Sequence, residues 1–188
     1  MEKESGMFCN LCSDARRYSV YGGWWRSLGF WVGATYRAGH AAHSVRIPGF
    51  RQLLILISWI LKLPFRLLFH VEIKSVTSIG PGLLMIHPYN ILVGENVEIG
   101  CECSIFHEVT LASGASPSLL KIGDHVVVFP GARILGGVTI GERSEIGANC
   151  VVTKDVAPYM IVVPPVARAI PQDLLRNKQS EDDPPPRG

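Results

Sequence analysis

An aliphatic residue that returns every six positions between residues 73 and 152 is the feature that most constrains the fold. A small or β-branched residue stands four places after it in most of these units, and glycine often follows it directly. An antiparallel sandwich would alternate with period two, and a doubly wound sheet would place helices between its strands, so neither pattern fits. The hexads predict very short strands wound into a triangular prism, with about three hexads in each coil. The aliphatic positions are Ile73, Ile79, Met85, Ile91, Ile99, Ile105, Leu111, Ile122, Val128, Ile134, Ile140, Ile146 and Val152.

Two longer intervals interrupt this period. Ile91 and Ile99 are eight residues apart, and Leu111 and Ile122 are eleven residues apart. We therefore expect residues 112–121 to leave the prism as a loop. Loops on a rigid repeat are the usual places where binding sites are built.

Charge divides the chain into two unlike parts. Residues 1–70 carry 9 Lys/Arg and 3 Asp/Glu, which gives +6, whereas residues 71–188 carry 9 and 13, which gives −4. The basic part is rich in aromatic and aliphatic residues, so we expect one or two amphipathic helices that pack on a partner subunit or lie at a membrane surface. Its longest apolar run, residues 53–61, is about half of the roughly 20 residues that a spanning helix needs, and Pro64 breaks it. We expect no membrane crossing and no nucleic-acid partner.

The five cysteines favour a reducing compartment, because their number is odd and no secretory segment is recognisable at the start of the sequence. We expect a cytoplasmic protein, peripheral at the inner face of the membrane if the helices bind lipid. Cys9 and Cys12 form a lone CxxC pair, so a frayed N-terminus is favoured over a zinc or redox site. The hexads place Cys103 and Cys150 inward as buried corner residues and Cys101 outward.

The sequence thus divides into three predicted parts. Residues 1–70 form a basic, helical N-terminal segment, residues 71–170 form the repeat domain, and residues 171–188 form a C-terminal extension. The end of this extension, SEDDPPPRG, is polar and proline-rich, which predicts disorder.

Three stretches of the repeat domain resemble a known family. They are IGPGLLMIHPYNILVGENVEIG (79–100), SIFHEVTLASG (104–114) and VVVFPGARILGGVTIGERSEIGANCVVTKDV (126–156). They are similar to the hexapeptide-repeat acyltransferases with a left-handed parallel β-helix, and most closely to the serine acetyltransferase-like branch. The resemblance implies a mainly β fold preceded by short helices, acetyl transfer from acetyl-CoA to a hydroxyl without a metal, and a homotrimer with its active site between neighbouring prisms.

The resemblance assigns the catalytic residues one by one. His87 matches the family's general base, and Glu72 matches the carboxylate that orients this base. Two other family positions differ: Ile86 replaces an aspartate, and Leu119 replaces a second histidine. The large helical domain of true serine acetyltransferases is also mostly missing. We therefore expect a hydroxyl of a surface polysaccharide or lipid-linked sugar as the acceptor, with L-serine as the alternative.

The hexad register predicts a column of side chains at one corner of the prism. If the hexads at 85, 105, 128 and 146 are each one coil apart, then His87, His107, Pro130 and Ala148 stack about 4.8 Å apart. Two imidazoles would then face the same cleft, with His107 as a further catalytic candidate. The small residues above them suit the pantetheine arm of the coenzyme, and Ala148 matches a coenzyme contact of the family.

The remaining coenzyme contacts follow from the same resemblance. We expect Ser113 to bind the coenzyme with Pro130 and Ala148, and Lys154 and Arg168 to bind its phosphates. Two other classes stay open. A zinc hydratase of this fold needs three converging histidines, and the required histidine pair is absent. A non-catalytic scaffold would bind no coenzyme.

Overall fold

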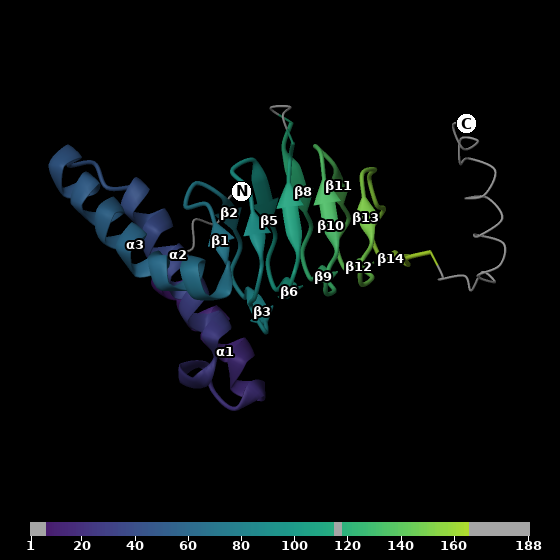
Figure 1. Ribbon diagram of the computed structural model, residues 1–188, viewed down its shortest axis with the longest axis horizontal. Coiled ribbons are helices and arrows are strands. Elements are labelled where there is room, and N and C mark those ends of the chain that lie inside the picture. Colours follow the sequence, from purple (N-terminus) through teal and green to yellow (C-terminus); the bar gives the residue numbers. More distant parts are fainter. Residues whose placement is uncertain (1–6, 115–117, 166–188) are drawn as a thin grey trace, which may run out of the picture.

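A helical cap covers one end of a prism of short parallel strands in the computed structural model of this chain (Figure 1). The structure describes residues 7–114 and 118–165. In Figure 1 the helices lie at the left and the coils of the prism follow one another to the right. The predicted fold class, a parallel β-helix of hexapeptide repeats preceded by α-helices, is confirmed, because every strand pairs in parallel with the strand of the next coil.

Fourteen strands form the three faces of the prism within the described residues. The first face consists of β1 (Glu72–Ile73), β4 (Leu92–Val93), β7 (Thr110–Ala112), β10 (Arg133–Leu135) and β13 (Val151–Val152). The second consists of β2 (Ser78–Ile79), β5 (Val97–Ile99), β8 (Leu120–Ile122) and β11 (Thr139–Ile140). The third consists of β3 (Leu84–Ile86), β6 (Ser104–Phe106), β9 (Val127–Val128), β12 (Glu145–Ile146) and β14 (Ile161–Val162).

The aliphatic ladder fills the prism, with one correction to the predicted register. Val93, not Ile91, holds the strand position of the second coil, because Val93 pairs with its neighbours on β1 and β7. Ile91 instead takes the short inward position at a corner, and it is 1% exposed. The eight-residue interval therefore lies between Met85 and Val93. Its two extra residues fall at the corner that carries His87.

The helical cap contains three α-helices and two short 3-10 helices. They are α1 (Met7–Tyr18), η1 (Ser19–Tyr21), η2 (Trp24–Arg26), α2 (Leu28–His43) and α3 (Pro48–Phe69). The predicted frayed N-terminus around Cys9 and Cys12 is therefore wrong from Met7 onward. Burial of Asp14 and Tyr18, both 2% exposed, holds α1 against the prism.

Helix α3 is longer and more regular than the sequence predicts. Pro64 lies inside it and does not end it. A proline inside a helix loses one N–H bond, and its ring crowds the carbonyl four residues earlier. Here α3 packs on the protein on both sides of Pro64, through Lys62 and Phe65, and continues. With 22 residues and a mean hydropathy of 1.7 over its most apolar window, α3 is long and apolar enough to cross a membrane. It meets this requirement by length and composition only, whereas the interrupted run 53–61 does not.

A buried ion pair joins the cap to the prism. The Arg37 guanidinium of α2 donates to the Asp14 carboxylate of α1 at 2.9 and 3.0 Å, and both residues are at most 4% exposed. Arg37 also donates to the carbonyls of Ile79 and Gly80, each at 2.7 Å. Asp14 in turn accepts two backbone N–H bonds from the first coil. Every charged group of the pair thus has a partner, which a buried pair requires.

Candidate active site

The corner between the third and the first face carries most of the predicted site. We call it the histidine corner, and it consists of residues 87–90, 107–108, 130–131 and 148–149. The N–H of Gly131 donates to the His107 carbonyl at 3.1 Å, and the N–H of Asn149 donates to the Pro130 carbonyl at 2.9 Å. These bonds place His107, Pro130 and Ala148 in one column, as the hexads predict.

His87 does not lie in that column, which corrects the predicted stack of two imidazoles. The N–H of Glu108 donates to the carbonyl of Tyr89 at 2.8 Å, so Tyr89 holds the position one coil below His107. The two extra residues of this coil, His87 and Pro88, form a bulge at the start of the corner, directly after β3. Asn90 takes the left-handed conformation that Glu108 has one coil above, with φ values of 50° and 60°.

The bulge presents His87 to the outside of the prism. Its backbone is left-handed, with φ of 50°, and the residue is exposed, while Pro88 beside it is buried. Within residues 7–114 and 118–165, no hydrogen bond or ion pair holds the His87 ring. An exposed imidazole without a partner is free to accept a proton from a bound hydroxyl.

His107 is half-buried and contains an unsatisfied polar atom. Its Nδ1 is buried and has no hydrogen-bond partner among the described residues. Buried polar atoms of this kind are rare in folded proteins and usually have a water, a ligand or another chain as their partner. His107 therefore remains a candidate for contact with a substrate or a neighbouring subunit.

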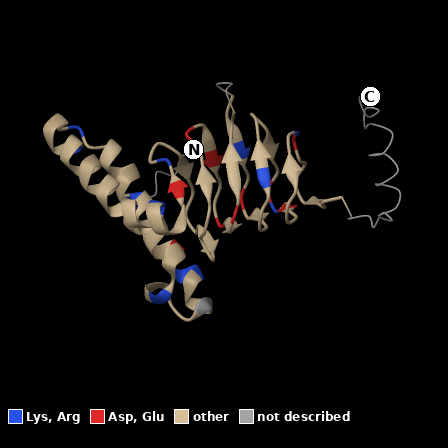
Figure 2. Cartoon of the chain, viewed as in Figure 1, with Lys and Arg blue, Asp and Glu red and all other residues tan. Residues whose placement is uncertain are grey.

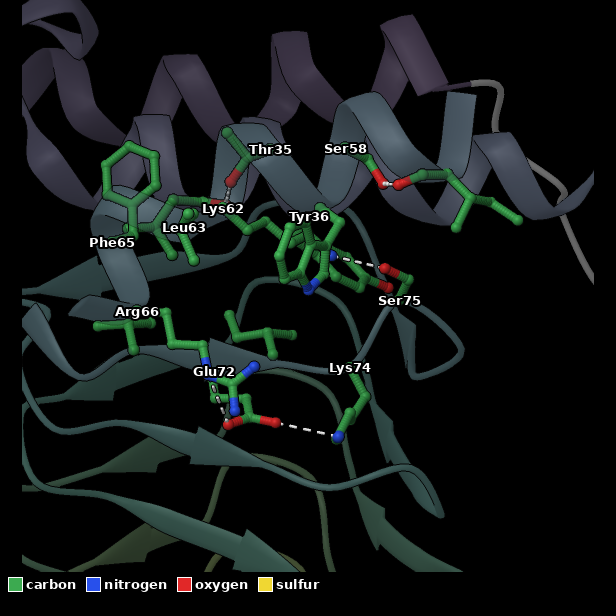
Figure 3. A pocket seen from close by; sticks show the side chains of 15 residues that line it. Thr35, Tyr36, Ser58, Lys62, Leu63, Phe65, Arg66, Glu72, Lys74 and Ser75 are labelled. Carbon is green, nitrogen blue, oxygen red and sulfur yellow. Dashed lines mark hydrogen bonds and ion pairs between the residues drawn. The ribbon is translucent and has the colours of Figure 1, made fainter. Parts of the chain in front are cut away.

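Glu72 lies on β1, next to the strand that follows the histidine corner, but it does not contact His87. Figure 3 shows its carboxylate between two cations: Lys74 Nζ lies 3.0 Å from Oε1, and Arg66 Nε lies 3.6 Å from Oε2. No ion pair joins Glu72 to His87 in the part of the chain that the structure describes. The predicted base–carboxylate pair is thus not formed among the described residues, and Glu72 pairs instead with Arg66 of α3 and with Lys74, which follows β1.

The same carboxylate lines a cavity that the sequence does not reveal. The cavity, about 240 Å³ in volume, lies between α2, α3 and β1, with Lys62, Arg66, Glu72 and Lys74 at its polar side (Figure 3). Lys62 Nζ donates to Ser75 Oγ at 2.5 Å. Burial lowers the pKa of Lys62 to about 8, because a desolvated ammonium is less stable than the neutral amine.

The predicted coenzyme residues are divided between two corners. Pro130 and Ala148 lie at the histidine corner, where Ala148 is exposed. Ser113 is 8% exposed and lies with the exposed Lys154 at the corner between the first and the second face. The whole first face separates the two groups within one chain. Arg168 lies outside the described residues.

The cysteines behave as the hexads predict. Cys103 and Cys150 are 1% and 3% exposed and fill corners of the prism. Burial raises the pKa of Cys103 to about 11, so its thiol stays protonated. Cys9 and Cys12 are both exposed on α1. No group of three metal-ligating side chains occurs among the residues that the structure describes.

The fold and the histidine corner define the class of protein: a hexapeptide-repeat β-helix with an imidazole at one corner. A family model described as "Bacterial transferase hexapeptide (six repeats)" matches residues 120–154. The serine acetyltransferase of Helicobacter pylori strain 26695 is 33% identical over 144 residues, which cover 73% of this chain and 78% of that protein. A solved structure of serine acetyltransferase in complex with CoA has a TM-score of 0.67 and 27% sequence identity, and the match covers 84% of this chain and 66% of that one.

The chain therefore belongs to the serine acetyltransferase family of hexapeptide-repeat proteins. The share of the relative that the match covers differs from one relative to another. The serine acetyltransferase of Mycobacterium tuberculosis is 38% identical over 101 residues, but these cover 52% of this chain and only 44% of that protein. The chain thus spans less than half the length of some of the curated relatives that it matches.

Proposed function

We propose that this protein is an acetyl-CoA-dependent serine O-acetyltransferase in which His87 is the general base. The observation that carries the proposal is the bulge of the histidine corner, which exposes an unpaired imidazole beside a column of small residues. The relatives named serine acetyltransferase favour L-serine over the sugar hydroxyl that the sequence alone suggests. Ile86 and Leu119 are the two residues that argue for the sugar, and the assay below compares the two acceptors.

The residues present fit an acetyl-CoA co-substrate at the pantetheine end. Pro130 and Ala148 leave the column above His107 without long side chains. Gly131 has φ of 73°, which side chains rarely adopt, and a Cβ there would meet the Asn149 side chain, so this position favours glycine. Bound acetyl-CoA would supply a thioester carbonyl that is open to attack by a hydroxyl.

His87 then has one role, which is proton transfer. As the new bond between the acceptor oxygen and the acetyl carbon forms, the imidazole takes the hydroxyl proton. When the bond between carbon and sulfur breaks, the imidazolium returns that proton to the leaving sulfur, so the products are the acetyl ester and the free thiol. General-base catalysis of this kind contributes about 10² to 10⁴ in rate. We place Glu72 as a positioning residue that must exchange its bond with Lys74 for one with His87.

The division of the predicted coenzyme residues supports a site shared between subunits. Within one chain, Ser113 and Lys154 lie across the first face from His87. A neighbouring prism that packs against the histidine corner brings the residues at the corner between its own first and second faces opposite the base. We therefore propose a homotrimer with three such clefts, located in the cytoplasm.

The test is release of free thiol from acetyl-CoA with L-serine or sugars as acceptors. His87→Asn keeps a residue that tolerates the left-handed backbone but cannot act as a base, so we expect kcat to fall by about 10² or more. His125→Asn is the matched control, because His125 is also exposed and has φ of 58° at a different corner. Full activity of His87→Asn would contradict the mechanism. Turnover of a sugar but not of serine would contradict the proposed acceptor.

A further inference from the structure

The polarity of α3 is inverted relative to that of a water-soluble helix. Three polar residues beyond its first turns contact the protein: Ser58 is 5% exposed, Lys62 bonds to Ser75, and Arg66 pairs with Glu72. Arg51, near the start of the helix, is exposed. The side turned away from the protein is apolar. We call it the outer face of α3, and it consists of Phe50, Leu53, Leu56, Ile57, Trp59, Ile60, Leu61, Leu67 and Leu68, which are 43% to 69% exposed.

This outer face is not stable in contact with water alone. A surface helix normally places its apolar stripe toward the core and its charges toward solvent. Here nine large apolar side chains follow one another along a 22-residue helix, and only 6% of its most apolar window is buried. Large contiguous apolar surfaces of this kind mark contacts with another protein or with a membrane.

Charge identifies which of these two partners fits. From Ala15 to Val71 the sequence contains eight Lys/Arg and no Asp or Glu. Figure 2 accordingly shows α2 and α3 without acidic residues. Arg26, Arg46 and Arg51 are exposed, and no carboxylate pairs with them among the described residues. Two copies joined through this surface would bring like charges together, whereas an anionic lipid headgroup would neutralise them.

Exposed tryptophans add a second feature typical of a membrane interface. In the cap, the rings of Trp25, Phe30 and Trp31 gather around Trp24 in edge-to-face and tilted contacts. Trp24, Trp25 and Trp31 are 39%, 61% and 46% exposed. Trp59 lies on the outer face itself and is 54% exposed. Indole rings are enriched at the level of the lipid headgroups, where one edge is apolar and the N–H remains hydrated.

We propose that the outer face of α3 docks on an anionic phospholipid bilayer, with the helix lying in the plane of the membrane surface. Although α3 is long enough to cross, its inner side is not free. Helix α2 packs along it, and Lys62 and Arg66 tie it to β1 and to the segment that follows β1. Only the outer face can therefore enter lipid, as in other interfacial amphipathic helices. This docking surface is independent of the proposed acetyl transfer.

The test uses the full chain and sedimentation with vesicles at low and high salt. The chain should bind vesicles of phosphatidylcholine mixed with phosphatidylglycerol, and much less those of phosphatidylcholine alone. Ile57→Glu/Leu61→Glu should lower binding at least about tenfold, because two charges then face the acyl chains. Val151→Glu/Val163→Glu is the matched control, since both valines are exposed apolar residues in the coils at the other end of the prism, and it should bind normally.

A second pair of substitutions tests the role of charge. Arg46→Gln/Arg51→Gln should weaken binding to the anionic vesicles about tenfold or more, because each cation near such a surface is worth about 1 kcal/mol. Brominated acyl chains should quench the fluorescence of Trp59, measured as the difference between the wild type and Trp59→Phe. This measurement needs no charged variant, so it tests the proposal even if Ile57→Glu/Leu61→Glu does not fold. Absence of vesicle binding at low salt would overturn the proposal. A dimer that Ile57→Glu/Leu61→Glu dissociates would assign the outer face to a second copy instead.

Discussion

The prism and the helical cap place their apolar side chains in opposite ways. In the prism, the aliphatic position of each hexad points inward, and Leu111, Ile134, Ile140 and Ile146 are completely buried. In α3, nine large apolar residues point outward, whereas Ser58 and Lys62 point inward. The prism is therefore explained by its own sequence, because each coil covers the next. The cap is explained only when a surface outside the chain is included.

The two regions meet at a polar junction, and we expect its loss to lower stability more than the loss of any other single contact between them. Asp14 and Arg37 are buried together and bond to the backbone of the first coil. Neither the hexads nor the apolar pattern of α3 contributes to this contact. The cap is thus attached to the prism by this buried ion pair, by further polar contacts of Tyr18, Lys62 and Arg66, and by apolar packing.

The largest effect is expected from breaking this junction on one side only. Asp14→Ala leaves the Arg37 guanidinium buried without its carboxylate, which costs about 3 to 5 kcal/mol in the free energy of unfolding. Urea unfolding followed by circular dichroism measures the loss. Arg16→Ala is the control, because Arg16 is exposed and its ion pair with Glu102 is 3.5 Å long. Equal stability of Asp14→Ala and the wild type would show that the buried ion pair is not needed to hold the cap.

A smaller effect, but a sharper comparison, comes from the same truncation in both regions. Leu111→Ala removes a fully buried side chain from the prism and should cost about 2 to 5 kcal/mol. Leu67→Ala removes a side chain that is 64% exposed on the outer face of α3, so it should change stability in dilute buffer by less than about 0.5 kcal/mol. Similar losses in both variants would mean that the outer face is buried in solution by another copy of the chain.

The prism is largely predictable from sequence because its signal repeats. The hexads at 85, 105, 128 and 146 occupy successive coils, as their spacing indicates. The pattern fails at Ile91, since Val93 is also aliphatic and only strand pairing decides between them. That two-residue shift moves His87 out of the column with His107, so the geometry of the candidate site depended on a detail that spacing does not contain.

The cap is less predictable because its contacts join distant segments. The period of α3 indicates an amphipathic helix but not which side faces the protein. One signal for the junction was present: Asp14 is the only acidic residue between Ser5 and Val71. A single carboxylate in a cationic segment is a candidate partner for a buried arginine. The position of Glu72 beside Lys74 and Arg66 had no comparable signal, since both cations read as ordinary surface charges.

The smallest expected effect concerns Lys62, the amine on the inner side of α3. Burial lowers the pKa of Lys62 to about 8, so the folded chain binds fewer protons than the unfolded chain between that pH and the ordinary lysine pKa of about 10.4. The destabilisation from Lys62 is complete below pH 8 and is relieved as the pH rises through this window, so stability relative to a neutral variant increases with pH. Because the side chain is partly exposed, we expect Lys62→Met to be more stable than the wild type by only about 1 kcal/mol at pH 7, with the difference shrinking by pH 10. Taking the difference between the two proteins in urea unfolding cancels the titration of tyrosines and cysteines. If the stability advantage of Lys62→Met instead grows between pH 8 and pH 10, the bond from Lys62 to Ser75 outweighs the cost of desolvation. The polar inner side of α3 would then stabilise the fold through its own hydrogen bonds.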